Sequence, residues 1–518
     1  MQASAISADV LGRLLESFLA DAPHAVVLEN GELLFDFATA RYSVSGEGKC
    51  VLHLWSDERN TVRRVLDAEL RPRLLRLSVL RFGQSQPTVL EISADRDQRS
   101  ATALRAIRSR YKQIFERVLL REFHGYKLES VSNRPDLEHS CSPVYTRGLL
   151  RQGQSAFAVL GVSADETQPS IDAALTFGIL WMHRQREQLA GRAHVAGLKL
   201  FAPAGRSQML RQRMSHLNRD AARWELYAFD ERAETCAPLD CDDSGNLATR
   251  LARAVDARSA RERFAASIAR MQAIEPASEA YVESPTEIVF RLYGLEFARA
   301  KLAPVEGSFR NIETITFGLW PAEHTLDQSN EDSFRDLVIR LAQRRSAGGD
   351  RSDPLFRLCP ERWLESLIIR DVRSIDERLD PRFVYSQVPA FASTDRAMLD
   401  VLTCTLEGRL AILELKADED IHLPLQGLDY WARVRYHQRE GGFLRHGYFA
   451  GRELSDAPPL LYFVAPALRT HPATDTLLRY LTPQIQWSVA QIDERWRESV
   501  RVINRKHPQT ISTTDLHP

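Results

Sequence analysis

Two acids and a lysine interrupt apolar segments in the C-terminal third of the chain. Asp400 lies in "MLDVLTCT", and Glu414 and Lys416 lie in "LAILELKA". Charged groups in such segments are costly to bury unless they are paired or bind a metal ion. Two converging carboxylates offer the hard oxygen ligands that Mg²⁺ and Mn²⁺ prefer. Such an ion would polarise a phosphoryl oxygen and lower the pKa of a bound water, and Lys416 would orient that water or stabilise developing charge.

The two segments are predicted to be neighbouring strands of a hairpin, because the intervening "LEGR" is a turn signal. Residues two apart share one face of a strand, so Glu414 and Lys416 project together. Asp400 joins that face only in the correct register. A three-residue loop that pairs Leu406 with Leu410 places Asp400 opposite Lys416, whereas a two-residue loop turns it to the other face. We therefore expect the three-residue loop or a bulge of equal effect.

The alternative interpretation is a structural ion pair in which Lys416 neutralises an acid within the sheet. The composition favours a functional lysine, because the chain has only seven lysines against 61 arginines. A structural pair would be expected to use arginine, as the chain does elsewhere. A site that requires a compact ammonium group would keep lysine.

Two predicted helices carry further polar groups. In "QGLDYW", Gln426 and Tyr430 are four residues apart and share one helix face, which Arg433 extends. In "PERWLESLIIRDV", Glu361 and Glu365 are also four apart, and one of them is expected near the metal ion. The alternative for both sets is an ordinary solvated helix face.

Taken together, the helix glutamates, Asp400, "ELK" at 414–416 and "QGLDY" at 426–430 resemble the PD-(D/E)XK nuclease superfamily. The resemblance is closest to the RecB-like branch with a QxxxY helix, which includes mismatch-specific endonucleases. It covers roughly residues 354–500 and implies a restriction-endonuclease-like fold, a mixed sheet flanked by helices. It also implies Mg²⁺- or Mn²⁺-dependent hydrolysis of phosphodiester bonds.

The same resemblance implies a role for each candidate residue. The metal ligands are Asp400 and Glu414, the catalytic lysine is Lys416, the helix motif that supports the site and contacts substrate is Gln426 with Tyr430, and the helix glutamate is Glu361 or Glu365. The proline of the family name is absent, because Leu399 precedes Asp400.

The length of 518 residues predicts several α/β domains rather than one core. We expect an N-terminal mixed module, a second domain led by a basic helix, a linking segment, a short linker and the nuclease-like domain. Their predicted bounds are 1–98, 99–255, 256–345, 346–353 and 354–518.

The second domain is predicted to be a degenerate copy of the last. Three short sequence motifs recur in the same order in the two regions. They are "AVLGVSADE" and "AILELKADE", "FAPA" and "VAPA", and "FDER" and "IDER", at offsets of 253, 263 and 263 residues. With no gap, Gly161 replaces Glu414 and Ser163 replaces Lys416, while Arg147 stands at the position of Asp400. Such a copy would lack a catalytic site. It would have a structural or substrate-binding role and would mimic a nuclease dimer within one chain.

Arginine and lysine side chains provide candidates for phosphate contact. Arg105, Arg108 and Lys112 lie on the basic helix that precedes the copy, and aromatic residues between such cations could stack on bases. The alternative is a solvated basic face with the aromatics packed inward. Arg433 and Arg435, near the motif helix, are the better candidates.

The formal net charge of −1 limits any nucleic-acid surface to a local patch. No apolar run is long enough to cross a bilayer, and the six cysteines form no CxxC pair, so we expect a cytoplasmic protein without a membrane partner. The expected function is DNA cleavage, in repair, restriction or phage defence, by a chain that could form a homodimer. The alternatives are an RNA-directed nuclease and a non-catalytic scaffold that binds nucleic acid or protein.

Overall fold

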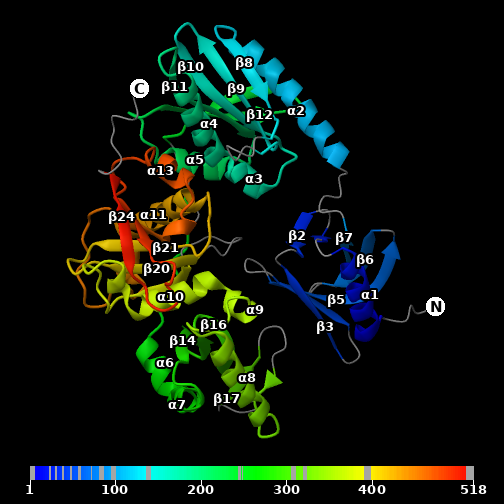
Figure 1. Cartoon of the computed structure of the whole chain (residues 1–518), viewed down its shortest axis with the longest axis vertical. Helices are drawn as coiled ribbons and strands as arrows, with labels where there is room; N and C mark the ends of the chain where they lie inside the picture. Colours follow the sequence, from blue (N-terminus) through cyan, green and yellow to red (C-terminus); the bar gives the residue numbers. More distant parts are fainter. Residues whose placement is uncertain are drawn as a thin grey trace. The chain divides into compact units, whose positions relative to one another are not determined.

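The structure is a computed structural model that describes most of the chain, with gaps. Its described residues contain four β-sheets with accompanying helices, so the multidomain α/β class is confirmed (Figure 1). The chain divides into two compact units, Met1–Ile107 with Leu319–Glu323, and the remaining residues. The described ranges are 6–22, 25–29, 32–37, 40–46, 50–55, 60–71, 73–80, 87–94, 101–135, 142–242, 247, 249–304, 311–318, 324–389 and 398–508.

The described residues of the N-terminal unit include a seven-stranded antiparallel sheet, in the strand order β2-β1-β7-β6-β5-β4-β3, and helix α1. Helix α1 begins after Ser7, whose hydroxyl accepts the Val10 N–H, and it buries Leu11, Leu15 and Phe18 in the core of this unit. The elements are α1 (Ala8–Asp21), β1 (Val26–Glu29), β2 (Glu32–Asp36), β3 (Arg41–Ser45), β4 (Val51–Trp55), β5 (Asn60–Arg71), β6 (Leu74–Leu80) and β7 (Thr88–Ser93).

The central domain, from α2 to β13, has a six-stranded sheet covered on both faces. Along β10, Ala158 and Leu160 pack toward α4, while Phe157 and Val159 pack toward α2. Covered faces explain the continuous apolar runs of these strands. The elements are α2 (Ala101–Glu122), β8 (Lys127–Ser132), β9 (Tyr145–Gln152), β10 (Ser155–Val162), α3 (Gln168–Asp172), α4 (Ala174–Gln188), β11 (His194–Pro203), α5 (Gln208–Met214), β12 (Arg223–Asp230) and β13 (Thr235–Leu239).

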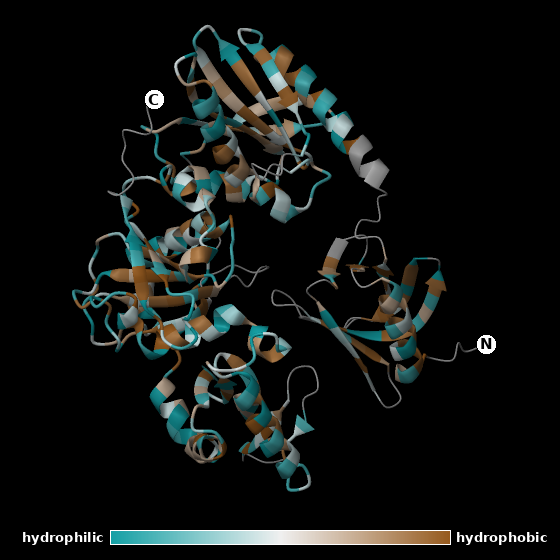
Figure 2. Cartoon of the chain, viewed as in Figure 1, coloured by the Kyte–Doolittle hydropathy of each residue, from teal (hydrophilic) through white to brown (hydrophobic). Residues whose placement is uncertain are grey.

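The C-terminal domain, from α9 to β24, also has a six-stranded sheet between helices. Figure 2 shows hydrophobic residues gathered on its strands and more hydrophilic residues on the surrounding loops. The elements are α9 (Pro354–Arg357), α10 (Pro360–Arg370), β19 (Tyr385–Pro389), β20 (Met398–Cys404), β21 (Leu410–Leu415), α11 (Leu423–Arg439), α12 (Gly442–Arg445), β22 (Leu460–Pro466), α13 (Ala473–Leu478), β23 (Trp487–Ile492) and β24 (Val502–Lys506), with short 3₁₀ helices η1 (Val372–Ser374) and η2 (Ala467–Arg469).

The central and C-terminal sheets have the same topology. Their strand orders are β8-β9-β10-β11-β12-β13 and β19-β20-β21-β22-β23-β24. In both sheets the third, fourth and fifth strands are mutually parallel, and every other neighbouring pair is antiparallel. The helices also enter at the same points of the order, α4 and α5 in one domain and α11 and α13 in the other. The predicted duplication requires that the two domains agree in strand order, strand direction and helix position, as they do here.

Between these domains in the sequence, the described residues form a five-stranded antiparallel sheet, in the order β14-β15-β16-β17-β18, with helices α6, α7 and α8. The elements are α6 (Ala257–Arg263), α7 (Ala265–Ile274), β14 (Glu279–Ser284), β15 (Glu287–Leu292), β16 (Leu295–Pro304), β17 (Asn311–Phe317), β18 (His324–Thr325) and α8 (Glu331–Arg344).

Arg345, directly after α8, ties this sheet to the C-terminal domain. Its fully buried guanidinium donates to Tyr293 O at 2.9 Å and to Leu355 O at 2.7 Å, and it lies 4.8 Å from the centre of the Trp363 ring. Burial lowers the pKa of Arg345 to about 10. The glycine-rich segment 346–353 therefore follows a tightly held junction.

The central and C-terminal domains share one apolar core. Leu175 and Ile179 of α4 and Leu210 of α5 belong to the same buried cluster as Leu428 of α11 and Leu477 of α13. A continuous core of this kind is typical of obligate interfaces rather than of loosely tethered domains.

The contacts between the two domains are reciprocal. Helix α4 packs on α13, and α11 packs on α5. The Asn218 N–H donates to Tyr480 O at 2.7 Å, and the Thr482 N–H donates to His216 O at 2.9 Å. Each bond is the image of the other when the two domains are exchanged, which is the property of an isologous, two-fold interface.

A buried ion pair adds to this interface. Arg213 of α5 donates to both carboxylate oxygens of Asp429 in α11, at 3.0 and 2.8 Å, and the two side chains are 10% and 14% exposed. Asp429 lies between Gln426 and Tyr430 in the sequence. The central domain therefore holds the helix that carries the predicted motif.

Asp429→Ala is expected to lower the free energy of unfolding by about 3–5 kcal/mol, because it leaves the Arg213 guanidinium buried without its partner. Chemical unfolding of the whole protein measures this change. Glu262→Ala, which breaks the exposed Arg258–Glu262 pair, is the control, with an expected change below about 0.5 kcal/mol. Equal losses in the two variants would contradict the role of the buried pair.

Candidate active site

The loop between β20 and β21 sets the register of the candidate acids. The pairs Cys404↔Leu410 and Val401↔Leu413 fix the ladder, and the Thr405 N–H donates to Arg409 O at 2.7 Å. The loop therefore has three residues, 406–408, as predicted, but it begins one residue earlier than the predicted Leu406–Leu410 pairing requires. At its last position Gly408 has a φ of +84°, a conformation that favours glycine.

This register corrects one detail of the prediction. Asp400 is the residue before Val401, and Glu414 is the residue after Leu413. Extending the Val401↔Leu413 pairing by one residue therefore places Asp400 across from Glu414, not from Lys416. The two alignments differ by two residues, and a shift of two preserves the face of a strand. Asp400 and Glu414 therefore share one face, as expected.

The two strands separate at the acids. Asp400 Oδ2 accepts the Leu415 N–H at 2.9 Å, in place of a backbone carbonyl of β20. The Lys416 N–H donates to Val464 O of β22 at 3.0 Å. The candidate site thus lies at the carboxyl end of β21, where β20 no longer pairs with it.

Helix α11 covers the face that carries the acids. Leu402 and Ile412, which share that face, belong to the same buried core as Leu428 of α11. The helix packs closely because it has Gly427, where a Cβ would lie 2.4 Å from a ring carbon of Phe463.

Tyr430 of α11 lies within electrostatic range of the carboxylates. Burial raises the pKa of Tyr430 well above its usual value, and the charges of Glu414 and Asp400 raise it further. Gln426, one turn earlier, is half-buried, and no hydrogen bond to its Oε1 is found among the described residues. The structure therefore places Tyr430 of the predicted helix motif near the carboxylate pair, with Gln426 one turn away on the same helix.

The carboxylate pair is crowded and incompletely satisfied. Burial, followed by the neighbouring Asp400, raises the pKa of Glu414 well above its usual value, and burial also raises the pKa of Asp400. Within the described part of the chain, Glu414 Oε2 has no hydrogen-bond partner. Two such groups ionise together only if a cation joins them.

Lys416 is surrounded by acids at the edge of the pair. Its Nζ lies 3.5 Å from Asp420 Oδ2, 3.9 Å from Glu361 Oε1 and 4.0 Å from Glu414 Oε1. Although burial lowers the pKa of Lys416, the charges of these carboxylates raise it by more. The ammonium group is therefore held charged but is not locked to a single partner.

The two glutamates of α10 have different surroundings. Glu361 faces Lys416, and its side chain is 47% exposed. Glu365 is buried and accepts hydrogen bonds from Gln387 Nε2 at 3.1 and 3.2 Å and from Arg362 Nη1 at 3.1 Å. Both lie within electrostatic range of Asp400, since its charge adds to burial in raising the pKa of each.

Three residues near the site were missed by sequence reasoning. Asp420 follows β21 in the acidic run "ADED", a signal that could have identified it. Arg362, between the two glutamates, orients Glu365. Gln387 reaches Glu365 from β19 with a φ of +54°, and no local pattern in the sequence predicts this contact.

The predicted phosphate-binding cations form internal contacts. Arg433 donates to Asp429 O at 2.9 Å, Arg435 to Asp456 O at 2.7 Å, and Arg108 to Glu166 at 2.7 and 3.1 Å. Lys112 is half-buried on α2, and the side chain of Arg105 lies outside the described residues.

The aromatic residues of α2 pack inward. Tyr111 and Phe115 are buried in the core between α2 and the central sheet. The inward-packing alternative for these aromatics is therefore confirmed, and they are not available to stack on bases.

In the central domain, the register shows which residues occupy the positions of the acids. In the central domain, Leu160 pairs with Leu200 of β11 on one side and with Arg147 of β9 on the other. In the C-terminal domain, Glu414 pairs with Phe463 of β22 and lies across from Asp400 of β20. Leu160 thus stands at the position of Glu414, and Arg147 at that of Asp400.

The predicted replacements Gly161 and Ser163 are wrong by one residue. The β9–β10 hairpin closes at Gln152↔Ser155 with a two-residue loop, one residue shorter than its counterpart. Gly161 faces α2 instead, since a Cβ there would lie 2.5 Å from Tyr111 Oη. Val162, rather than Ser163, therefore corresponds to Lys416.

Helix α4 completes the comparison. Gly178 of α4 lies close to Leu198 of β11, as Gly427 of α11 lies close to β22. Counted from these two glycines, Phe177 corresponds to Gln426, and Trp181 corresponds to Tyr430. The Trp181 Nε1–H donates to Gly148 O at 2.9 Å, and the Arg147 guanidinium lies 5.7 Å from the centre of the Trp181 ring. The central domain thus has a cation and apolar side chains where the C-terminal domain has carboxylates, an ammonium and polar groups.

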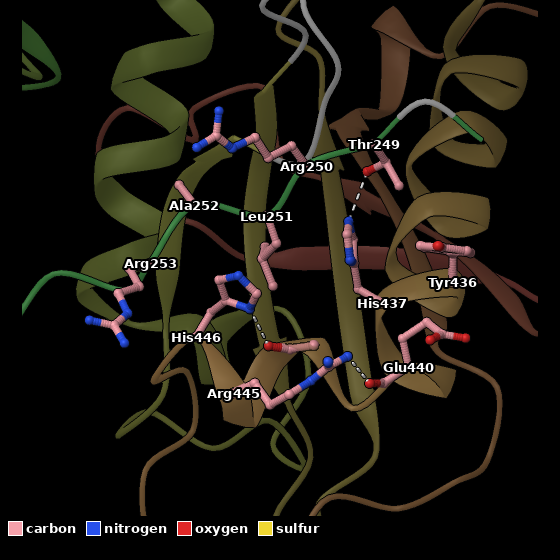
Figure 3. Close-up of a pocket in the computed structure, with 11 residues that line it drawn as sticks. Thr249, Arg250, Leu251, Ala252, Arg253, Tyr436, His437, Glu440, Arg445 and His446 are labelled. Carbon is pink, nitrogen blue, oxygen red and sulfur yellow. Dashed lines mark hydrogen bonds between the residues drawn. The ribbon is translucent and has the colours of Figure 1, made fainter. Parts of the chain in front are cut away.

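A separate cavity lies at the far end of α11. Its volume is about 800 Å³, and its lining includes Arg250, Arg253 and Arg445 (Figure 3). Within it Thr249 Oγ1 and His437 Nε2 are 2.8 Å apart. None of the predicted site residues lines this cavity, so it is distinct from the carboxylate pair.

Across the described ranges, no cluster of three or more His, Cys, Asp and Glu side chains is placed to hold a metal ion, and Asp400 with Glu414 offers two carboxylates. No helix there combines the length and apolar composition needed to span a membrane. Neither a protein-family model nor a curated protein matches the chain.

The buried Glu365 predicts a pH-dependent stability of the metal-free protein. Burial raises the pKa of Glu365 from 4.5 to about 8. The folded state therefore keeps a proton that the unfolded chain releases, so this contribution is complete below pH 4.5 and is lost as the pH rises toward 8.

With a chelator present, the free energy of unfolding should fall between about pH 5.5 and about pH 7.5, by at most about 1.4 kcal/mol per pH unit from this group. Glu365→Gln, which cannot ionise, should flatten the slope, while the exposed Glu262→Gln should keep it. An unchanged slope in Glu365→Gln would contradict the assignment.

Proposed function

We propose that the chain is a Mg²⁺- or Mn²⁺-dependent nuclease of the PD-(D/E)XK type that hydrolyses phosphodiester bonds in DNA. The observation that carries the proposal is the pair of carboxylates on neighbouring strands, the buried Glu414 and the half-buried Asp400. One carboxylate oxygen lacks a hydrogen bond within the described residues, and the ammonium of Lys416 lies beside the pair.

The residues fit a hard divalent cation. Mg²⁺ is usually held by one or two carboxylates, keeps several waters and completes its shell with substrate phosphate oxygens. Asp400 and Glu414 would hold the ion, and its charge would allow both carboxyl groups to ionise. When bound, the ion polarises a phosphoryl oxygen and lowers the pKa of a bound water.

The remaining groups have roles that follow from their positions. Lys416 donates to the attacking water or to the negative charge that builds on the phosphate. Glu361 and Asp420, both within 4 Å of its Nζ, keep the ammonium protonated and in place. Gln426 and Tyr430 support the carboxylates from α11 and contact the substrate.

The central domain supports the same proposal as a silent copy of the fold. It shares the topology of the C-terminal sheet but has Arg147 and Leu160 at the positions of the acids. The alternative function is a non-catalytic scaffold. The incompletely satisfied carboxylate pair favours the nuclease, because a scaffold has no need for a charge cluster at this cost.

Cleavage of a panel of matched DNA and RNA substrates with Mg²⁺ or Mn²⁺ tests the proposal. DNA should be cut only with the metal, and Glu414→Ala and Lys416→Ala should each reduce the rate by roughly 10²-fold or more, because each removes a group that acts in the transition state. Lys506→Ala, a lysine on strand β24 of the same domain, should retain activity.

Metal-independent binding without cleavage would instead indicate the scaffold. Preferential cleavage of RNA would correct the substrate class while keeping the reaction.

A further inference from the structure

We infer that one chain is a complete intramolecular dimer with a single reaction centre, and that on duplex DNA each binding event breaks one strand. The inference rests on the proposed function and adds to it the subunit stoichiometry and the product. Two features carry it: the reciprocal interface inside the chain and the closed second site.

The interface that could pair two nuclease domains is already occupied within the chain. Helices α4 and α5 of the central domain and α11 and α13 of the C-terminal domain contact each other reciprocally. Their apolar residues form one buried cluster, and the bidentate Arg213–Asp429 pair crosses the interface. A second chain cannot use the same face of α11 without displacing the central domain from this core.

The second site is closed both sterically and chemically. Leu160 and Val162 are fully buried where Glu414 and Lys416 stand in the other domain. Arg147 is 6% exposed, so the position of Asp400 carries a buried cation that would repel a metal ion. Trp181 fills the position of Tyr430 and is fixed by its hydrogen bond to Gly148 O. No change of side-chain rotamer converts these residues into metal ligands.

The product on a duplex follows from this asymmetry. The two strands of DNA are antiparallel, so a symmetric pair of active sites cuts both strands, one site to each strand. Here only one of the two pseudosymmetric positions can react. Each event consumes one water and breaks one P–O bond, which leaves a phosphomonoester, a free hydroxyl and an intact partner strand.

A duplex with a different fluorophore on each strand tests the inference. Protein is bound to the duplex without metal, and Mg²⁺ is then added together with excess heparin, so that released protein cannot bind again. Denaturing and native gels together should show molecules with one cut strand. Loss of both strands from the same duplex molecule would overturn the inference while keeping the nuclease assignment.

A mixing experiment tests the stoichiometry separately. Active protein at a fixed concentration is supplemented with increasing amounts of Glu414→Ala protein, with DNA in excess over both. The cleavage rate should stay constant, because each active chain works alone. A rate that falls as inactive chains are added would show a functional dimer of chains and overturn the inference.

The same substrates separate this inference from the proposed function. Cleavage of single strands with an intact duplex would keep the nuclease and remove the one-strand product on duplex DNA. Absence of cleavage on every substrate and metal would remove both.

Discussion

The repulsion between the buried carboxylate of Glu414 and the half-buried carboxylate of Asp400 is the constraint on which the rest of the C-terminal domain depends. Asp400 and Glu414 are brought together because a three-residue loop sets the β20–β21 register, and because the strands separate where Asp400 accepts the Leu415 N–H. Groups around the pair respond to its charge. Lys416 remains protonated near three acids, and burial together with the charge of Asp400 raises the pKa values of Glu365 and Tyr430. A divalent ion is the simplest group that relieves this arrangement.

The second structural theme is the use of one topology twice. In the C-terminal domain the sheet supports charged and polar groups, and in the central domain the equivalent positions are filled by apolar side chains and a buried arginine. The central domain is not a separate appendage, because its Arg213 binds Asp429 on the helix that carries Gln426 and Tyr430. A domain without the candidate site residues thus has a structural role in positioning the domain that carries them.

The sequence predicts the candidate site well where the signal is local. Charged residues within apolar strands identify Asp400, Glu414 and Lys416, and four-residue spacing identifies Gln426 with Tyr430 and Glu361 with Glu365. Three short sequence motifs that recur in the same order point to the duplication, and the two sheets share the topology that a duplication requires.

The predictions that failed or could not be made involve loop length and long-range contacts. Because the β9–β10 hairpin loop is one residue shorter, the counterpart of Glu414 is Leu160 instead of Gly161, and the counterpart of Lys416 is Val162 instead of Ser163. The contacts Gln387–Glu365, Arg213–Asp429 and Arg345–Tyr293 join residues 22, 216 and 52 positions apart and leave no periodic signal.

The most direct test of the central claim is crystallography of the protein soaked in Mn²⁺, with anomalous scattering used to locate the metal. The account predicts one strong anomalous peak within coordinating distance of both Asp400 and Glu414, with the Lys416 ammonium close to but outside the metal shell. A peak elsewhere, or an empty site with Lys416 bonded directly to one of the two carboxylates, would contradict it.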